Sequence, residues 1–140
     1  VDAEDFFMRP SVDIERMTVL RPGELLTTIR IPSTWAGATF YYEKVEDRKA
    51  WDFALMTVAS AMRINGGVIE EVRMAVNGAA PFPIRLEDSE AVLRGQVPSE
   101  ELGLRAGDVA VRDAQPLRHN DYKVPLMRNL VRRAVRGTGV

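Results

Sequence analysis

The middle of the chain alternates apolar and polar residues with a period of two, the pattern of β-strands with one buried face. The run 38–45 (ATFYYEKV) is rich in aromatic and β-branched residues and predicts one strand. The run 53–64 suits a helix or a buried strand, but Asn-Gly-Gly at 65–67 is a strong hairpin signal. We therefore predict a hairpin whose second strand has two faces, one with Val68, Glu70, Val72, Met74 and Val76 and the other with Ile69, Glu71, Arg73 and Ala75.

Three further segments complete the first half of the chain. The segment 24–32 (ELLTTIRIP) alternates and predicts a strand, which Pro32 ends because proline has no amide hydrogen for the ladder. The charged segment 46–52 (EDRKAWD) predicts an exposed loop between two strands. Residues 1–20 have no steady period and predict an arm or linker with at most one short strand.

The last third of the chain has helical spacing. Residues 86–94 predict a helix followed by Gly95, because glycine is common just after a helix C-terminus. The favourable N-cap at residue 99 predicts a second helix over 99–114. Gly103 and Gly107 are expected to weaken that helix, since glycine has low helix propensity.

A final helix is predicted to begin between residues 120 and 125. Its apolar stripe comprises Leu126, Met127, Leu130, Val131 and Ala134. Strands thus precede helices, an order typical of α+β domains. We predict an antiparallel three- to four-stranded sheet packed against about three C-terminal helices, with residues 1–20 as an arm and 21–140 as one domain.

Composition narrows the classes of function. The chain has 140 residues, 46% of them hydrophobic, with no cysteine and a single histidine, His119. The lack of cysteine excludes disulfides, thiolate zinc sites and iron–sulfur clusters on this chain, and a lone histidine in a loop predicts a surface group. The net charge of −1 argues against general nucleic-acid binding. No apolar run approaches the ~20 residues that a membrane span requires.

The passage from the aromatic strand into the charged loop is the strongest candidate for chemistry. Lys44 follows Tyr41 and Tyr42, and the loop contains Trp51. A lysine beside aromatic rings can bond a polar heterocycle while the rings shape its pocket. The alternative, which composition by itself favours, is a surface lysine on an edge strand with Trp51 filling the core.

The last helix also carries a cluster of arginines. They are Arg128, Arg132, Arg133 and Arg136. Such a cluster can meet phosphates, or it can be the solvated or partner-facing side of an amphipathic helix. The acidic segment 86–113 can pair with arginines inside the same domain, which would need no external partner.

Four segments resemble one known family. Residues 40–54 (FYYEKVEDRKAWDFA) resemble the Tyr/Phe-x-Lys-Val-x-x-Arg-x-x-x-Asp-x-Ala signature of the flavoprotein subunits of molybdenum hydroxylases. The segments 20–32 (LRPGELLTTIRIP), 74–85 (MAVNGAAPFPIR) and 120–134 (NDYKVPLMRNLVRRA) resemble family segments in the same order. The chain is therefore similar to the C-terminal domain of the FAD-binding medium subunit in this family, which includes xanthine dehydrogenase, aldehyde oxidoreductase and CO dehydrogenase.

The resemblance implies an oxidoreductase built from several subunits. A molybdopterin-binding large subunit would oxidise the substrate, and an iron–sulfur small subunit with [2Fe–2S] clusters would pass electrons to FAD and on to an acceptor. The C-terminal domain would close over the isoalloxazine ring, whereas the Gly-rich loops for the FAD diphosphate belong to an N-terminal portion that is absent here. The resemblance implies no catalytic residue and no metal site in this chain, and an isolated domain that is inactive.

Carried over residue by residue, the resemblance assigns cofactor contacts to Lys44, Arg48, Trp51 and Asp52. Lys44 matches the lysine that reaches the flavin, where a cation would stabilise the reduced ring and raise its potential. Arg48 is expected to brace the loop. Trp51 departs from xanthine dehydrogenases, which have an acidic residue at this position, so the acceptor stays open among NAD⁺, oxygen and a quinone.

Two other functions compete with this one. The first is an assembly module that docks the flavin subunit onto its partners through the arginine-rich helix. The second is nucleic-acid binding through Arg132 and Arg133, against which the acidic half of the chain argues. No signal peptide is visible, so we expect a cytoplasmic protein, or a periplasmic one exported through a partner's signal.

Overall fold

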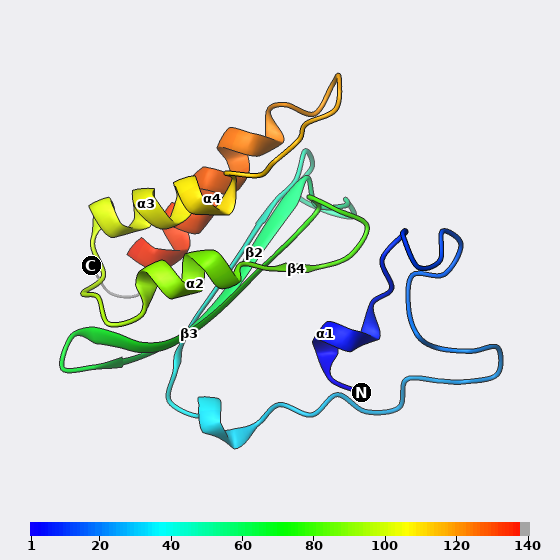
Figure 1. The fold of residues 1–140 in the computed structure, drawn as a ribbon, viewed down its shortest axis with the longest axis horizontal. Helices are drawn as coiled ribbons and strands as arrows, with labels where there is room; N and C mark the ends of the chain where they lie inside the picture. The colour runs from blue at the N-terminus through cyan, green and yellow to red at the C-terminus, as the bar shows by residue number, and fades with distance from the viewer. Residues whose placement is uncertain (138–140) are drawn as a thin grey trace.

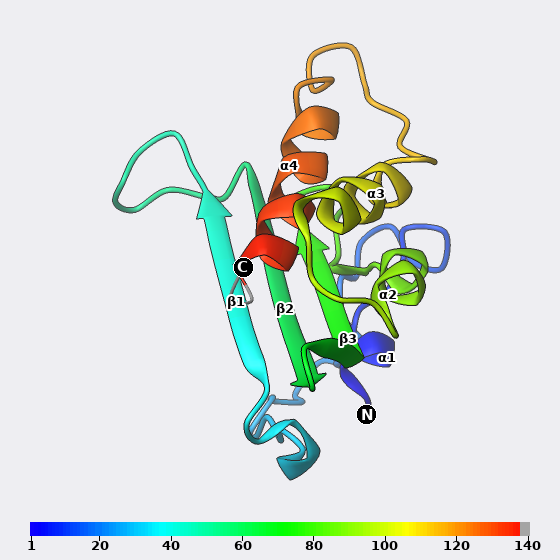
Figure 2. The same cartoon turned by 90° about the vertical axis from the view of Figure 1, so that its left-hand side faces the viewer.

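The computed structural model describes residues 1–137, an antiparallel sheet covered on one face by three helices (Figure 1 and Figure 2). Its strands lie in the order β1 (Thr39–Val45), β2 (Met56–Asn65), β3 (Val68–Asn77) and β4 (Ile84–Arg85). The covering helices are α2 (Glu87–Leu93), α3 (Glu100–Ala110) and α4 (Lys123–Arg136). The predicted α+β architecture is confirmed.

The hairpin of β2 and β3 forms where the Asn-Gly signal predicts it. Gly66 and Gly67 make a two-residue turn with φ of 57° and 81°. Glycine adopts such positive values without steric cost, and they match the twist of the flanking strands. The run 53–64 is therefore a strand and not a helix from Met56 onward, whereas residues 53–55 belong to the preceding loop.

A β-bulge near this turn corrects the predicted faces of β3. Ile64 pairs with Ile69, whereas Arg63 pairs with Glu71, so Glu70 is the extra residue. Because one inserted residue reverses the alternation, Ile69 is buried and Glu70 is exposed, opposite to the prediction. Beyond the bulge, Val72, Met74 and Val76 share one face of β3 as predicted, and this face is buried.

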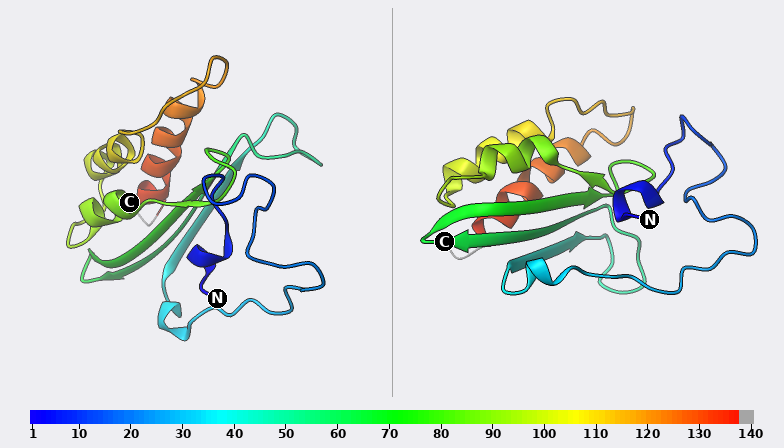
Figure 3. Two further views of the ribbon diagram at one scale, coloured as in Figure 1. Left: turned by 45° about the vertical axis from the view of Figure 1, so that its right-hand side comes forward. Right: turned by 60° about the horizontal axis from the view of Figure 1, so that its bottom comes forward.

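The core lies between the sheet and the helices, and the opposite face of the sheet is open (Figure 3). The strands and α4 supply most of the buried side chains, among them Met56, Val58, Met62, Met127, Leu130, Val131, Ala134 and Val135. The open face alternates with this core face along each strand. It carries the exposed rings of Phe40 and Tyr42, which pair in register with Ala61 and Ala59.

Helices α3 and α4 approach closely because α3 has glycine where they cross. A Cβ atom on Gly107 would lie 2.6 Å from the carbonyl oxygen of Arg128, and one on Gly103 would lie 3.1 Å from that of Arg132. A side chain at residue 107 would therefore force the helices to shift, whereas one at residue 103 would require only a small adjustment. The predicted end of this helix near residue 114 is wrong, since α3 ends at Ala110 and a turn follows.

Three of the clustered arginines are paired within the chain. The ion pairs are Arg128–Asp108 at 2.6 Å, Arg132–Glu100 at 3.1 Å and Arg133–Glu43 at 2.5 Å. The first two join α4 to α3, and the third joins α4 to β1. Opposite charges on neighbouring elements therefore pair with these three arginines within the chain.

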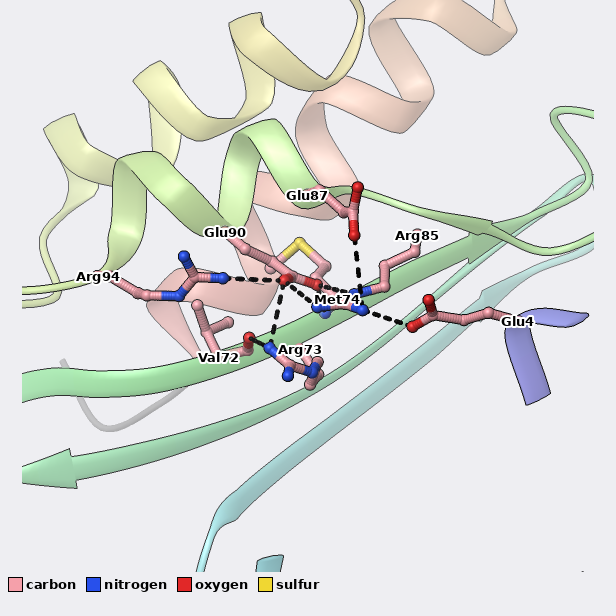
Figure 4. A network of polar contacts seen from close by, with 8 residues as sticks. All are labelled: Glu4, Val72, Arg73, Met74, Arg85, Glu87, Glu90 and Arg94. Carbon is pink, nitrogen blue, oxygen red and sulfur yellow. Dashed lines mark hydrogen bonds and ion pairs between the residues drawn. The ribbon is translucent and has the colours of Figure 1, made fainter. Parts of the chain in front are cut away.

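A buried carboxylate joins α2 to the sheet (Figure 4). The oxygens of Glu90, which is 0% exposed, face the Met74 amide at 3.0 Å, Arg85 Nε at 2.9 Å and Nη2 at 2.8 Å, Arg94 Nη2 at 3.4 Å and Arg73 Nη1 at 3.7 Å. Burial raises the pKa of Glu90, but the hydrogen bonds from Arg85 and Met74 outweigh it, and the pKa lies below its ordinary value. The charged carboxylate of Glu90 therefore connects α2 to β3 and β4.

The N-terminal part of the chain forms an arm beside the open face. It contains a short helix, α1 (Ala3–Phe6), an isolated bridge between Phe7 and Thr18, and a 3₁₀ turn, η1 (Ser33–Trp35). The predicted strand over 24–32 is wrong for this structure, because no strand among residues 1–137 pairs with it and its residues are exposed. Within residues 1–137, no helix is long and apolar enough to cross a membrane.

Candidate functional site

The loop between β1 and β2 projects away from the helices and the sheet (Figure 2). It spans residues 46–55, three residues longer than the charged segment 46–52 that predicts it. The Leu55 amide donates a hydrogen bond to the Val45 carbonyl at 2.8 Å and closes its base. The four residues assigned from the family resemblance all lie at this loop, which we call the β1–β2 loop.

Lys44 lies at the first stem of the loop, and its ammonium group is held by the loop itself. Its Nζ donates a 2.7 Å hydrogen bond to the carbonyl oxygen of Asp52 and forms an ion pair with Glu46. The hydrogen bond to Glu46 raises the pKa of Lys44 above its usual range, so the amine stays charged at neutral pH. The side chain as a whole is 34% exposed.

Arg48 and Asp52 brace the loop, as predicted for Arg48. The Arg48 amide donates to Asp52 Oδ2 at 3.0 Å, and its Nη2 donates to the Trp51 carbonyl at 3.2 Å. Asp52 Oδ1 accepts a 2.9 Å hydrogen bond from the Phe53 amide. These contacts fix the backbone of the loop. Arg48 and Asp52 therefore determine the shape of the loop.

Trp51 is at the loop tip and does not fill the core. Its side chain is 99% exposed, and its φ of 55° is unfavourable for any residue with a Cβ atom. The alternative in which this residue plugs the core is therefore wrong. Phe53, which sequence reasoning did not single out, is also 94% exposed. The loop thus exposes two large rings, and exposed aromatic rings are suited to stacking on a planar partner.

A groove of about 790 Å³ lies between the open face of the sheet and the N-terminal arm. Tyr42 and Phe40 of β1 form one wall, and Phe7 and Phe82 contribute from the other side. Tyr42 and Lys44 are two residues apart and therefore lie on the same face of β1. The aromatic surface of the groove thus extends along β1 toward the loop.

Other candidates for chemistry are weaker. His119 is exposed in the turn before α4. Within the described residues, no group of three or more histidine, aspartate or glutamate side chains is arranged to hold a metal ion. Gly66 and Gly67 lie between two strands, so they form a turn and not a phosphate cradle.

The fold and the site together define one class of domain. It is an antiparallel sheet covered by helices on one face, with a loop of cationic and aromatic side chains at one end of the sheet. Residues 40–138 match the CO dehydrogenase flavoprotein C-terminal domain family, and the chain belongs to this family. The match covers β1 to α4, including the whole β1–β2 loop.

Relatives and solved structures agree with this assignment. The chain is 32% identical to the carbon monoxide dehydrogenase medium chain of Hydrogenophaga pseudoflava, over 96% of this chain and 46% of that one. It is 32% identical to the aldehyde oxidoreductase FAD-binding subunit of Escherichia coli, over 87% of this chain and 35% of that one. A solved carbon monoxide dehydrogenase from Hydrogenophaga pseudoflava matches with a TM-score of 0.78 and 32% identity, over 87% of this chain and 44% of that one. The chain thus spans about half or less of the relatives it matches.

Proposed function

We propose that this chain is the C-terminal domain of the FAD-binding medium subunit of a molybdenum hydroxylase, and that its β1–β2 loop lies against the flavin. The observation that carries the proposal is the loop itself, in which the charged Lys44 ammonium is fixed to the carbonyl of Asp52, the residue that follows the fully exposed Trp51. The family membership and the names of the relatives, a carbon monoxide dehydrogenase medium chain and an aldehyde oxidoreductase FAD-binding subunit, support it.

The residues of the loop fit one side of a flavin ring. Lys44 would face the N1–C2 carbonyl edge, where negative charge gathers on reduction, and Trp51 would stack on the ring plane. Arg48 and Asp52 would hold these two groups in place through the bonds described above. When bound, FAD would supply the redox chemistry that links iron–sulfur clusters on a small subunit to an electron acceptor, with molybdopterin on a large subunit.

The proposal is tested by FAD titration and redox titration of the full-length medium subunit with Lys44→Ala. Loss of one charge-assisted hydrogen bond should weaken FAD binding by about 10- to 100-fold. Loss of the cation should also lower the midpoint potential, by about 30 mV for each 1.4 kcal/mol in a two-electron couple. The matched control is Lys49→Ala, an exposed lysine in the same loop.

The alternative function, an assembly module without flavin contact, predicts a different result. Lys44→Ala would then leave both the FAD affinity and the potential unchanged. The internal ion pairs of Arg128, Arg132 and Arg133 leave fewer free charges on α4 for docking than its sequence suggests. These ion pairs therefore argue against partner docking and against nucleic-acid binding where either function would depend on free arginines of α4.

A further inference from the structure

The β1–β2 loop has two stems, and Lys44 of the first stem reaches the returning limb at the carbonyl of Asp52. The second stem begins at Leu55, directly before β2, which starts at Met56. The Leu55 amide is bonded to Val45, but its carbonyl faces away from that bond toward the connector that follows β3. The second stem is thus in contact with two segments, Val45 through the Leu55 amide and the connector through the Leu55 carbonyl.

Gly78, in the connector between β3 and β4, lies directly against this stem. A Cβ atom on Gly78 would be 2.7 Å from the Leu55 carbonyl oxygen and 3.1 Å from Met56 Cα. Its φ of 84° is also in the region that side chains rarely adopt. The backbone of the connector can approach the loop this closely only because residue 78 is glycine.

Lys123, the first residue of α4, holds Gly78 in this position. Its half-buried side chain donates a hydrogen bond from Nζ to the Gly78 carbonyl oxygen at 2.7 Å. A hydrogen bond from an ammonium group is stronger than one between neutral groups. The contact joins residues 45 positions apart, and it links the segments 74–85 and 120–134, neither of which reaches the loop tip.

We infer that Lys123 and Gly78 are positioning residues for the β1–β2 loop: α4 fixes the connector through Lys123, and the connector supports the second stem through Gly78. They act through the Leu55 backbone and not by contact with the loop tip. The consequence for flavin binding rests on the proposed function, but the positioning itself does not.

The test is hydrogen–deuterium exchange of the full-length medium subunit after removal of FAD. Lys123→Met should raise the exchange rates of amides in 46–55 by about tenfold or more, since a charge-assisted hydrogen bond that holds a local opening is lost. Lys123→Arg should restore slow exchange, and Arg105→Met, at an exposed position on α3, should leave it unchanged. Unchanged exchange in 46–55, or an equal rise throughout the hairpin 56–77, would overturn the inference.

A second pair of variants tests Gly78 with matched backbone strain. Gly78→Ala should also accelerate exchange in 46–55, because its Cβ would push against the Leu55 carbonyl. Gly67→Ala has almost the same positive φ of 81° but open space around it, so it should disturb only the hairpin turn. If both variants left 46–55 unchanged, the inference would be contradicted.

The FAD-loaded subunit separates this inference from the proposed function. If Lys123→Met accelerates exchange in 46–55 and also shifts the flavin midpoint potential, with both effects reversed by Lys123→Arg, both proposals are supported. If exchange is faster but the potential and the FAD affinity are unchanged, the positioning inference is supported and the flavin role of the loop is rejected.

Discussion

Glu90 is a glutamate without exposed surface that nevertheless remains charged. Arg85 donates two hydrogen bonds to it, and Arg73 and Arg94 add positive charge. Because these arginines come from β4, β3 and the end of α2, one carboxylate fixes three elements at a single point. Sequence reasoning did not identify it, since a glutamate in the first turns of a helix is usually solvated and close to the helix N-terminus.

Glu90→Gln should lower the free energy of unfolding at neutral pH by about 3 kcal/mol, the low end for breaking a buried ion pair. The pKa of Glu90 in the fold lies below its ordinary value of 4.5. The ionised form therefore stabilises the fold above that value, and this stabilisation is lost as the pH falls through the folded-state pKa. Urea denaturation should thus show the gap between the two proteins narrowing below pH 4.5.

A gap that stays constant as the pH falls would contradict this assignment. The control is Glu87→Gln, one turn earlier on α2. Glu87 is exposed and lies 3.6 Å from Arg85, so its loss should change stability by less than about 0.5 kcal/mol.

The candidate site was predictable residue by residue, but only in part. The spacing of Lys44, Arg48 and Asp52 was enough to place them in one loop, and their mutual hydrogen bonds follow from that proximity. The exposure of Trp51 was not predictable, because a large aromatic side chain is more often buried than exposed. Lys123 was not predictable as a support of this loop, since its partner Gly78 is distant in sequence.

At the scale of elements, α3 shows that one residue type can have opposite effects on a helix and on its packing. Gly103 and Gly107 lower helix propensity, which is all that the sequence reveals. In the structure they allow α4 to approach within contact of the α3 backbone. The net contribution of each glycine to stability therefore depends on which effect is larger.

Gly107→Ala should decide this balance in favour of packing. Alanine gains about 1 kcal/mol of helix propensity, but its Cβ atom would lie 2.6 Å from the Arg128 carbonyl, and overpacking of this kind costs about 1–3 kcal/mol. We expect a net loss in the free energy of unfolding, measured by urea denaturation. Gly103→Ala, with a distance of 3.1 Å, should be closer to neutral. A more stable Gly107→Ala variant would show that the helices can separate at little cost.

The strands show that an alternating sequence pattern predicts the presence of a hairpin better than it predicts the hairpin's register. Two apolar runs around Asn-Gly specify the turn and the pairing of β2 with β3. That pattern does not predict the bulge at Glu70. Whichever face of residues 68–71 is buried, one of the glutamates at 70 and 71 is exposed, so the alternation does not show where the extra residue lies. The two-residue β4 is too short for any periodicity and depends on its pairing with β3.

At the scale of the whole molecule, the segment 24–32 is the clearest departure from prediction. Its apolar side chains are exposed, with Leu25 at 83%, Ile29 at 79% and Ile31 at 81%. An alternating segment of this kind needs a neighbouring strand to bond its backbone and bury one face. If the chain belongs to a longer medium subunit, as proposed above, we expect residues 24–32 to pair with a strand outside residues 1–137.

The double variant Ile29→Asp/Ile31→Asp tests this proposal by comparing two lengths of chain. In the 140-residue chain, both side chains are exposed, so the free energy of unfolding should change by less than about 0.5 kcal/mol. In the full-length subunit, the loss of two buried isoleucines should cost roughly 3–6 kcal/mol. Val58→Asp, in the core of β2, should destabilise both chains and serves as the control. If the full-length subunit were indifferent to the double variant, residues 24–32 would be a solvated linker, and the alternation of their apolar residues would have no structural role.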